Sequence, residues 1–191
     1  MTALSLIRIA WIVWLISWFA AAAWSDRTVR RPAVRREVLY RVLTLAGAAL
    51  MFGFNPDGER TDTPLWPVAS VIAWVLAGVA VCGFLFTWWA RIHLGQLWSS
   101  SVTRKEHHHV VDTGPYGIVR HPIYTGLLLA IVATVLMRAT IITLAGGALI
   151  AVGIYVKARV EEEFLRQQLG EPYAAYARQV PMLVPFRRFS R

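Results

Sequence analysis

Long apolar segments separated by charged loops constrain this chain more than any other feature. A membrane-spanning helix needs about 20 mostly apolar residues, and the segment from Ala3 to Trp24 supplies them with Arg8 as its only charge. A cleavable signal peptide would have a shorter apolar core before a small-residue cleavage site. Further segments run from Val38 to Phe54, Pro67 to Ala90, Pro122 to Met137 and Thr140 to Val156. The sequence therefore predicts an all-α membrane protein with five transmembrane helices.

The basic residues predict how these helices are oriented. The chain carries 20 Lys and Arg against 11 Asp and Glu. Most of the basic residues lie in the first loop, in the third loop and after the last segment, whereas the opposite side has only Arg8, Arg60 and Arg138. The positive-inside rule then puts the N-terminus outside and the C-terminus in the cytoplasm. Because the charges follow the membrane topology, we expect membrane lipids as partners and no nucleic acid.

The chain divides into two regions. Residues 1–90 hold the first three segments and short loops, and residues 91–191 hold a long loop, a helical hairpin and an amphipathic tail. The last helix is expected to continue past the membrane to Leu169, because good helix formers follow it and Gly170 with Pro172 ends it. The tail beyond lies either against the membrane surface or back over a site. We expect the chemistry in residues 91–191.

The segment from Gly114 to Gly126 concentrates unusual residues. Pro122 suits the first position of a helix and keeps His121 out of the helical conformation. Arg120 and His121 therefore lie at a helix entrance, where unpaired amides and the Arg120 charge favour an anion such as a carboxylate. The alternative is that Arg120 reaches lipid phosphate and His121 only caps the helix.

A second cluster contains Lys157, Arg159, Glu161, Glu162 and Glu163. Lys157 precedes Glu161 by four residues, as Arg159 precedes Glu163, so ordinary ion pairs along one helix would explain them. Carboxylates close to lipid nevertheless need a partner. A sulfonium or a ribose hydroxyl could be that partner.

Three adjacent histidines, His107 to His109, form a third group. Consecutive side chains rarely converge on one ion, and neither a ligand-spaced motif nor a second cysteine beside Cys82 accompanies them. We expect no metal site. The alternative of another class is a non-catalytic membrane sensor, or a metal- or haem-handling protein, that uses these histidines and His121.

Several ordered motifs between Arg91 and Phe186 together resemble the isoprenylcysteine carboxyl methyltransferase family, which in turn resembles the phospholipid N-methyltransferases. The motifs are Leu94-Gly95-x-x-Trp98-Ser99, His108-His109-Val110-Val111, Gly114-Pro115-Tyr116, Arg120-His121-Pro122-x-Tyr124-x-Gly126, Glu161-Glu162 and Gly170-x-x-Tyr173-x-x-Tyr176. Their common order makes the resemblance specific, whereas Arg-His-Pro alone would not. The glycine fingerprint of soluble Rossmann-type methyltransferases is absent from the sequence.

The resemblance implies an S-adenosylmethionine-dependent methyltransferase with a helical cofactor pocket on the cytoplasmic side of a bacterial inner membrane. The implied cofactor contacts are His108, His109, Val110, Val111, Tyr116, His121, Pro122, Ile123, Tyr124 and a glutamate, either Glu161 or Glu162. A basic residue just before that pair, Lys157 or Arg159, is implied to meet the acceptor.

The acceptor itself stays open at this point. A lipophilic carboxylate of the isoprenylcysteine type is already ionised and needs no general base. A phospholipid or other amine would first have to lose a proton, with Glu162 or His121 as the base. A nicotinamide-dependent reductase on a similar helical scaffold is a more distant alternative.

Overall fold

The computed structural model describes residues 1–21, 34–53, 63–95 and 110–186, and within these ranges it contains helices and no strand. The all-α prediction is therefore confirmed for the described residues. The helices are α1 (Ala3–Ala20), α2 (Val34–Phe52), α3 (Ser70–Leu94), the 3-10 helix η3 (Gly114–Gly117), α4 (Pro122–Arg138), α5 (Ile141–Leu169) and α6 (Glu171–Gln179).

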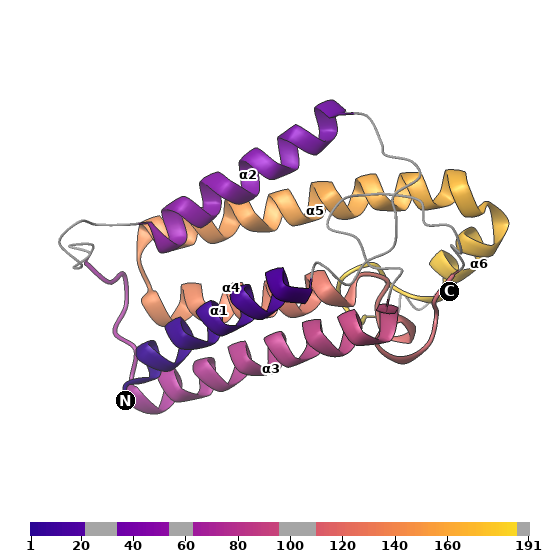
Figure 1. Cartoon of the computed structure of the whole chain (residues 1–191). Helices are drawn as coiled ribbons and strands as arrows, with labels where there is room; N and C mark the ends of the chain where they lie inside the picture. Colours follow the sequence, from indigo (N-terminus) through magenta and orange to yellow (C-terminus); the bar gives the residue numbers. More distant parts are fainter. Residues whose placement is uncertain (22–33, 54–62, 96–109, 187–191) are drawn as a thin grey trace.

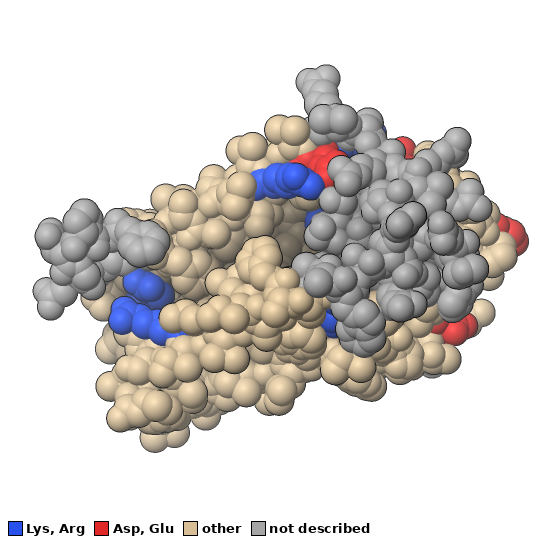
Figure 2. All heavy atoms as spheres, in the orientation of Figure 1, with Lys and Arg blue, Asp and Glu red and all other residues tan. Residues whose placement is uncertain are grey.

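Three helices, α1, α3 and α5, are long and apolar enough to cross a membrane. Their outer faces carry exposed large apolar side chains, for example Val71 at 75% and Ile141 at 63% exposure. Water would penalise such surfaces, whereas lipid accommodates them. Figure 2 agrees, because uncharged residues cover most of the described helical surface on the face that it shows. The chain is therefore an integral membrane protein.

The other two predicted spans are helices as well, but they are weaker candidates for a full crossing. α4 is apolar and only 17 residues long, and α2 has Arg36, Glu37 and Arg41 in its first half. Five crossings, and the orientation that follows from an odd number, stay predictions.

The long helices form two close pairs, α2 with α5 and α3 with α4 (Figure 1), and glycines lie where the helices of each pair meet. In the α2–α5 pair, a Cβ atom on Gly47 would lie 2.6 Å from the carbonyl oxygen of Gly146. In the α3–α4 pair, a Cβ atom on Gly83 would lie 2.5 Å from the carbonyl oxygen of Gly126. Small residues allow this close backbone approach, which is how helices gain packing energy in lipid. A larger side chain at either crossing has no room.

Tryptophans of α1 join this helix to the α3–α4 pair. The indole nitrogen of Trp11 donates to Thr134 Oγ1 at 3.0 Å, and that of Trp14 donates to Thr87 Oγ1 at 2.7 Å. Both indoles are buried. The polar tips of these large side chains are thus satisfied inside the apolar core.

The last two long helices form the predicted tight hairpin. α4 ends at Arg138, and Ala139 takes a left-handed conformation with φ 53°. Thr140 then caps α5 through a hydrogen bond from the Thr143 amide at 3.2 Å. α5 continues to Leu169 and ends at Gly170, whose φ is 59°, so the predicted long helix and its glycine stop are confirmed. α6 turns back from this point toward the start of α4 (Figure 1).

Candidate functional site

A glycine turn leads into the candidate site. Gly114 has φ 56°, and a Cβ atom there would lie 2.8 Å from the His93 ring. His93 Nε2 lies 2.9 Å from Thr113 Oγ1, which ties the turn to the end of α3. Pro122 occupies the first turn of α4, and His121 before it has φ −123° and ψ 63°. His121 is thus outside the helical region, as the sequence predicted.

Arg120 lies at this entrance with 9% of its side chain exposed, and its guanidinium is engaged with the protein. Its Nε and Nη2 donate to the two carboxylate oxygens of Glu162 at 2.7 and 2.9 Å. Its Nη1 donates to the carbonyl oxygen of Ala177 at 2.9 Å and to that of Val180. The predicted roles for Arg120, an anion receptor or a contact to lipid phosphate, are therefore not what the structure shows. Its guanidinium instead joins the turn before α4 to α5 and to the tail.

The tail also occupies the helix entrance. The Arg120 amide donates to the carbonyl oxygen of Pro181 at 2.8 Å, and the His121 amide donates to that of Met182 at 3.1 Å. Thr125 Oγ1 donates to the carbonyl oxygen of Leu183 at 2.6 Å. Of the two placements expected for the tail, folding back over the site is the one observed. These two amides, expected to attract an anion, are satisfied by backbone carbonyls.

Glu162 is the centre of a buried polar network. Besides Arg120, its carboxylate faces His121 Nε2 at 3.1 Å and accepts from Tyr173 Oη at 2.9 Å. Arg166 Nη2 donates to the same carboxylate at 3.3 Å. A buried carboxylate needs such donors to stay ionised, and here they come from four different residues. Glu162 is thus an internal partner rather than an open ligand contact.

His121 lies between the two carboxylates. Its Nδ1 is 3.4 Å from Glu161 and its Nε2 is 3.1 Å from Glu162, and its ring stacks on Tyr124 with centroids 5.5 Å apart. Burial disfavours the imidazolium, but the hydrogen bonds to Glu161 and Glu162 outweigh it and raise the pKa of His121. The side chain makes no capping hydrogen bond.

Glu161 and Lys157 form the second half of the cluster. Tyr124 Oη donates to Glu161 at 2.6 Å. The Lys157 ammonium lies 5.3 Å from the centroid of the Tyr124 ring and 5.7 Å from that of Tyr40, within the range of cation–π attraction. Arg159 instead is exposed and lines a groove with Arg36 and other residues of α2 and α5. Of the two predicted acceptor contacts, Lys157 is therefore the one beside Glu161 and Tyr124.

The remaining predicted cofactor residues differ in their placement. Tyr116 is buried, and burial raises the pKa of its hydroxyl. Tyr176 Oη donates to the Tyr116 carbonyl oxygen at 2.7 Å. Pro122 is buried, and Ile123, Val110 and Val111 are half-buried. His108 and His109 lie outside the described residues, as does His107.

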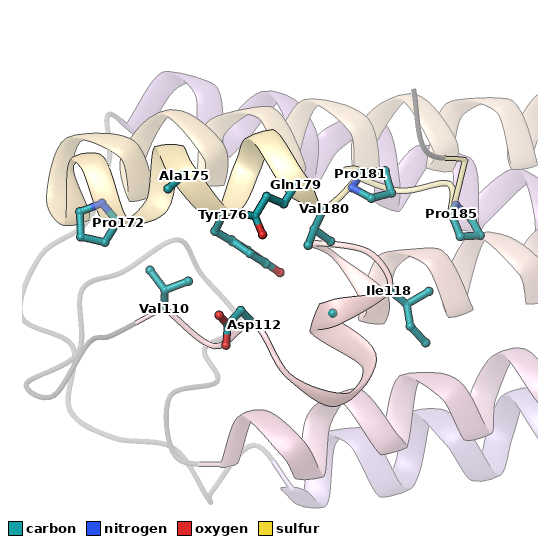
Figure 3. Close-up of a pocket in the computed structure, with 11 residues that line it drawn as sticks. Val110, Asp112, Ile118, Pro172, Ala175, Tyr176, Gln179, Val180, Pro181 and Pro185 are labelled. Atoms are coloured by element: carbon teal, nitrogen blue, oxygen red, sulfur yellow. The ribbon is translucent and has the colours of Figure 1, made fainter. Parts of the chain in front are cut away.

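An open pocket of about 670 Å³ borders this network, between α6 and the segment before α4. Figure 3 shows Val110 and Asp112 on one side and Tyr176, Gln179 and Val180 on the other. Ligand pockets in proteins commonly have roughly 300 to 1,000 Å³, so a nucleoside-sized molecule fits by volume. One implied cofactor contact, Val110, lines this pocket.

Three tyrosines at the site have no individual role predicted from the sequence. Tyr173 and Tyr176 belong to the Gly170-x-x-Tyr173-x-x-Tyr176 motif, and in the structure their hydroxyls donate to Glu162 and to the Tyr116 carbonyl oxygen, respectively. Tyr40 of α2 stands next to Lys157 and has no signal in the sequence beyond its position in a span. Aromatic residues spaced by three, as in Tyr173 and Tyr176, mark one helical face, which is the only hint that was available.

Comparison with known proteins identifies a family that matches this chain. The family model of the isoprenylcysteine carboxyl methyltransferase (ICMT) family matches residues 75–167. Protein-S-isoprenylcysteine O-methyltransferase B of Arabidopsis thaliana is 37% identical over 86 residues, which are 44% of this chain and 44% of that protein. Methanethiol S-methyltransferase 2 of Bradyrhizobium diazoefficiens is 35% identical over 143 residues, which are 68% of this chain and 52% of that protein.

A relative with a different kind of name also matches. The cobalt-zinc-cadmium resistance protein CzcN of Cupriavidus metallidurans is 29% identical over 146 residues, or 75% of this chain and 60% of that protein. The chain spans about half the length of the methyltransferases it matches, with 44% and 52% of those two proteins covered.

Proposed function

We propose, from the premise that the chain is related to the isoprenylcysteine carboxyl methyltransferase family, that it transfers the methyl group of S-adenosylmethionine to a lipophilic acceptor in the membrane. The observation that carries the proposal is the meeting of two distant segments. The Arg-His-Pro turn before α4 contacts the Glu161–Glu162 pair of α5, at the polar end of the long helices. These segments hold two of the motifs on which the resemblance rests, Arg120 to Gly126 and Glu161-Glu162.

The side chains of the cluster suit S-adenosylmethionine chemically. S-adenosylmethionine carries a sulfonium and an ammonium, and it supplies a methyl group that a nucleophile can take directly. The cluster offers a carboxylate, Glu161, and the rings of Tyr124 and Tyr116, which suit a cation and a nucleoside. Glu162 and Arg120 hydrogen-bond to each other and to the tail. We therefore assign them a structural role in holding the site together. Glu161 is the carboxylate that we assign to the ligand.

An acceptor that is already an anion suits this site best. A carboxylate needs no base, so alignment of the two reactants and exclusion of water are the main requirements. Lys157 supplies the positive charge that would hold such an acceptor. An amine would need a base to remove its proton. The two groups expected for that role, His121 and Glu162, are already paired with each other, and Glu162 is also paired with Arg120. We therefore propose carboxylate O-methylation over phospholipid N-methylation.

A thiol is the second candidate acceptor. It is favoured by one observation, the match to a methanethiol S-methyltransferase that extends over 68% of this chain. A thiol, unlike a carboxylate, is mostly protonated at neutral pH and has to lose its proton before it attacks the methyl group. The two candidates therefore differ in the acceptor atom, in its size and in whether the site has to take up a proton.

The membrane position of the site supports a lipid-borne acceptor. Such an acceptor would reach the site laterally between helices, while the cofactor enters from the water phase. The basic residues that follow α5 support a cytoplasmic side, which in a bacterium is the inner face of the inner membrane. Long-chain acceptors should then be methylated and short water-soluble analogues of the same acid should not.

The experiment is methyl transfer from radiolabelled S-adenosylmethionine by the purified protein in lipid nanodiscs. The acceptors are an S-farnesylcysteine acid, its carboxamide, methanethiol and phosphatidylethanolamine. We expect label in the acid and none in the carboxamide. Phosphatidylethanolamine as the preferred acceptor would replace the carboxylate proposal by N-methylation. An absence of label in all four acceptors would contradict the methyltransferase proposal.

Matched variants test the residue roles. Lys157→Met should lower kcat/KM for the acid by about 10- to 100-fold, the effect of losing one charged hydrogen bond. Arg159→Met removes the same charge two residues away on the exposed side of α5 and should leave the rate unchanged. An equal loss in both variants would show that only the overall charge of this region matters.

A further inference from the structure

Tyr40 of α2 carries a buried hydroxyl without a partner. The residue is 4% exposed, and its Oη is the only buried side-chain polar atom without a hydrogen bond among the residues that the structure describes. Three other tyrosines of the site donate hydrogen bonds from their hydroxyls, at 2.6 Å for Tyr124, 2.9 Å for Tyr173 and 2.7 Å for Tyr176. Buried polar groups are almost always paired, and because this hydroxyl has no partner among the described residues, it is available to a hydrogen-bonding group of a ligand.

The place of Tyr40 is fixed by helix packing. On α5, a Cβ atom at Gly153 would lie 2.6 Å from Thr44 Oγ1 and 3.2 Å from the Tyr40 carbonyl oxygen. The backbone of α2 at Tyr40 is therefore held directly against α5, one helical turn before Lys157. The Lys157 ammonium lies 5.7 Å from the Tyr40 ring. The backbone at Tyr40 is thus fixed by packing, and its side chain is buried beside Lys157.

The charges of the site favour an anion at this point. The basic groups are Arg120, Arg166, Lys157 and His121, and they face the two carboxylates of Glu161 and Glu162. The two arginines and the lysine alone outnumber the two carboxylates by one positive charge. An ammonium beside an O–H donor is a typical pair of contacts for a carboxylate.

We infer that the Tyr40 hydroxyl, together with the Lys157 ammonium, binds the carboxylate of the acceptor and so sets the preference of the site for acids over neutral analogues. The inference rests on the proposed function and deepens it. It also extends the acceptor site to α2, which lies outside the residues 75–167 that match the family. A site built to hydrogen-bond a substrate group rejects analogues that lack the group, because its own polar atoms then stay unpaired.

The test is Tyr40→Phe, which removes the hydroxyl and keeps the ring beside Lys157. In nanodiscs, we expect the KM for the S-farnesylcysteine acid to rise about tenfold and the KM for S-adenosylmethionine to stay the same. The preference for the acid over its carboxamide, measured by inhibition constants, should fall by a similar factor. The matched control is Tyr155→Phe, a tyrosine of α5 that is 51% exposed and should show wild-type constants.

Thermal unfolding separates a binding role from a structural one. Removing a hydroxyl that has no partner costs no hydrogen bond, so Tyr40→Phe should unfold at or above the wild-type temperature. A clear loss of thermal stability would mean that the hydroxyl already has a partner in the protein, and would overturn the inference. An acceptor KM within twofold of wild type, or an equal rise for acceptor and cofactor, would also overturn it.

Arg41 provides a check on direct contact. Its guanidinium pairs with Glu37 at 2.5 Å. It also lies close enough to the Tyr40 hydroxyl to act on it by charge and by side-chain contact, although the contact does not have hydrogen-bond geometry. Arg41→Gln should leave the acceptor KM unchanged. A Tyr40→Phe effect that disappears in the Arg41→Gln background would show that the hydroxyl acts through Arg41, which contradicts the inference.

The two proposals fail in different ways. If the protein binds the acid tightly and Tyr40→Phe weakens this binding, but no methyl group is transferred, the proposed function is overturned. The inference that Tyr40 binds the acid is then retained. Methyl transfer to the acid that is indifferent to Tyr40→Phe would keep the function and remove Tyr40 from the acceptor site. Direct binding of the acid to the nanodisc-bound protein is therefore measured beside turnover.

Discussion

The helix pairs and the polar end of this protein are held together in different ways. In the helix pairs, backbones touch at Gly47–Gly146 and Gly83–Gly126, and shape decides what fits. At the polar end, Arg120 and Glu162 join three chain segments through buried charge. Changes of size should therefore damage the first region, and changes of charge or pH should damage the second.

The largest effect is expected at a glycine crossing. Gly83→Leu places a side chain where even a Cβ atom lies 2.5 Å from a backbone carbonyl, so we expect no folded protein. Gly78 on the same helix has nothing within 4 Å, and Gly78→Leu should fold normally. Size-exclusion chromatography in detergent distinguishes monodisperse from aggregated protein. Equal behaviour of the two variants would contradict close packing of α3 on α4.

The next largest effect is expected at the buried ion pair. Arg120→Met leaves the Glu162 carboxylate without its main partner, which costs about 3 to 5 kcal/mol for a buried pair. The tail also loses its hydrogen bonds to the guanidinium, so trypsin should cut at Arg178 earlier than in the wild type. Limited proteolysis and thermal unfolding measure the two effects.

A double variant sharpens this result. Glu162→Gln in the Arg120→Met background removes the unpaired charge, so the double variant should be more stable than the sum of the single effects. Strict additivity would show that Arg120 and Glu162 do not depend on each other.

A smaller effect is expected from pH. The folded pKa of His121 is raised above its ordinary value of 6.5, so the fold stabilises the imidazolium. This contribution is fully present below pH 6.5 and is lost as the pH rises through the raised pKa. Thermal unfolding of the wild type should show the loss, and His121→Gln should be flat over the same range. A wild type that gains stability with rising pH there would contradict the ion pairs of His121.

The smallest effect is expected at Thr125. Thr125→Val removes the hydrogen bond to the carbonyl oxygen of Leu183, which contributes about 1 kcal/mol. The Arg120 and His121 amides, which donate to the tail, should then exchange with deuterium faster. Unchanged protection of these amides would show that the tail does not need this contact.

Sequence reasoning predicted the features that depend on local pattern. The extension of α5 to Leu169 follows from helix formers and the Gly170 stop, and the conformation of His121 follows from Pro122. The contact between the Arg-His-Pro turn and Glu161–Glu162 was predicted from the family resemblance, since neither segment alone indicates the other.

What the sequence missed depends on tertiary docking. The helix entrance at Pro122 has the pattern of an anion site, but carbonyls of Pro181 and Met182 fill it. No periodicity in the tail specifies this partner. The choice between Lys157 and Arg159 likewise required the position of α2, because both residues are equally plausible on an isolated helix.

The central claim is that the turn before α4 and the Glu161–Glu162 region form one site for S-adenosylmethionine. Ultraviolet cross-linking of radiolabelled S-adenosylmethionine to the nanodisc-bound protein, followed by peptide mapping, tests it most directly. We predict label in peptides from residues 110–126 and 157–176, and excess unlabelled cofactor should abolish it. Label confined to other peptides, or label that unlabelled cofactor does not displace, would contradict the claim.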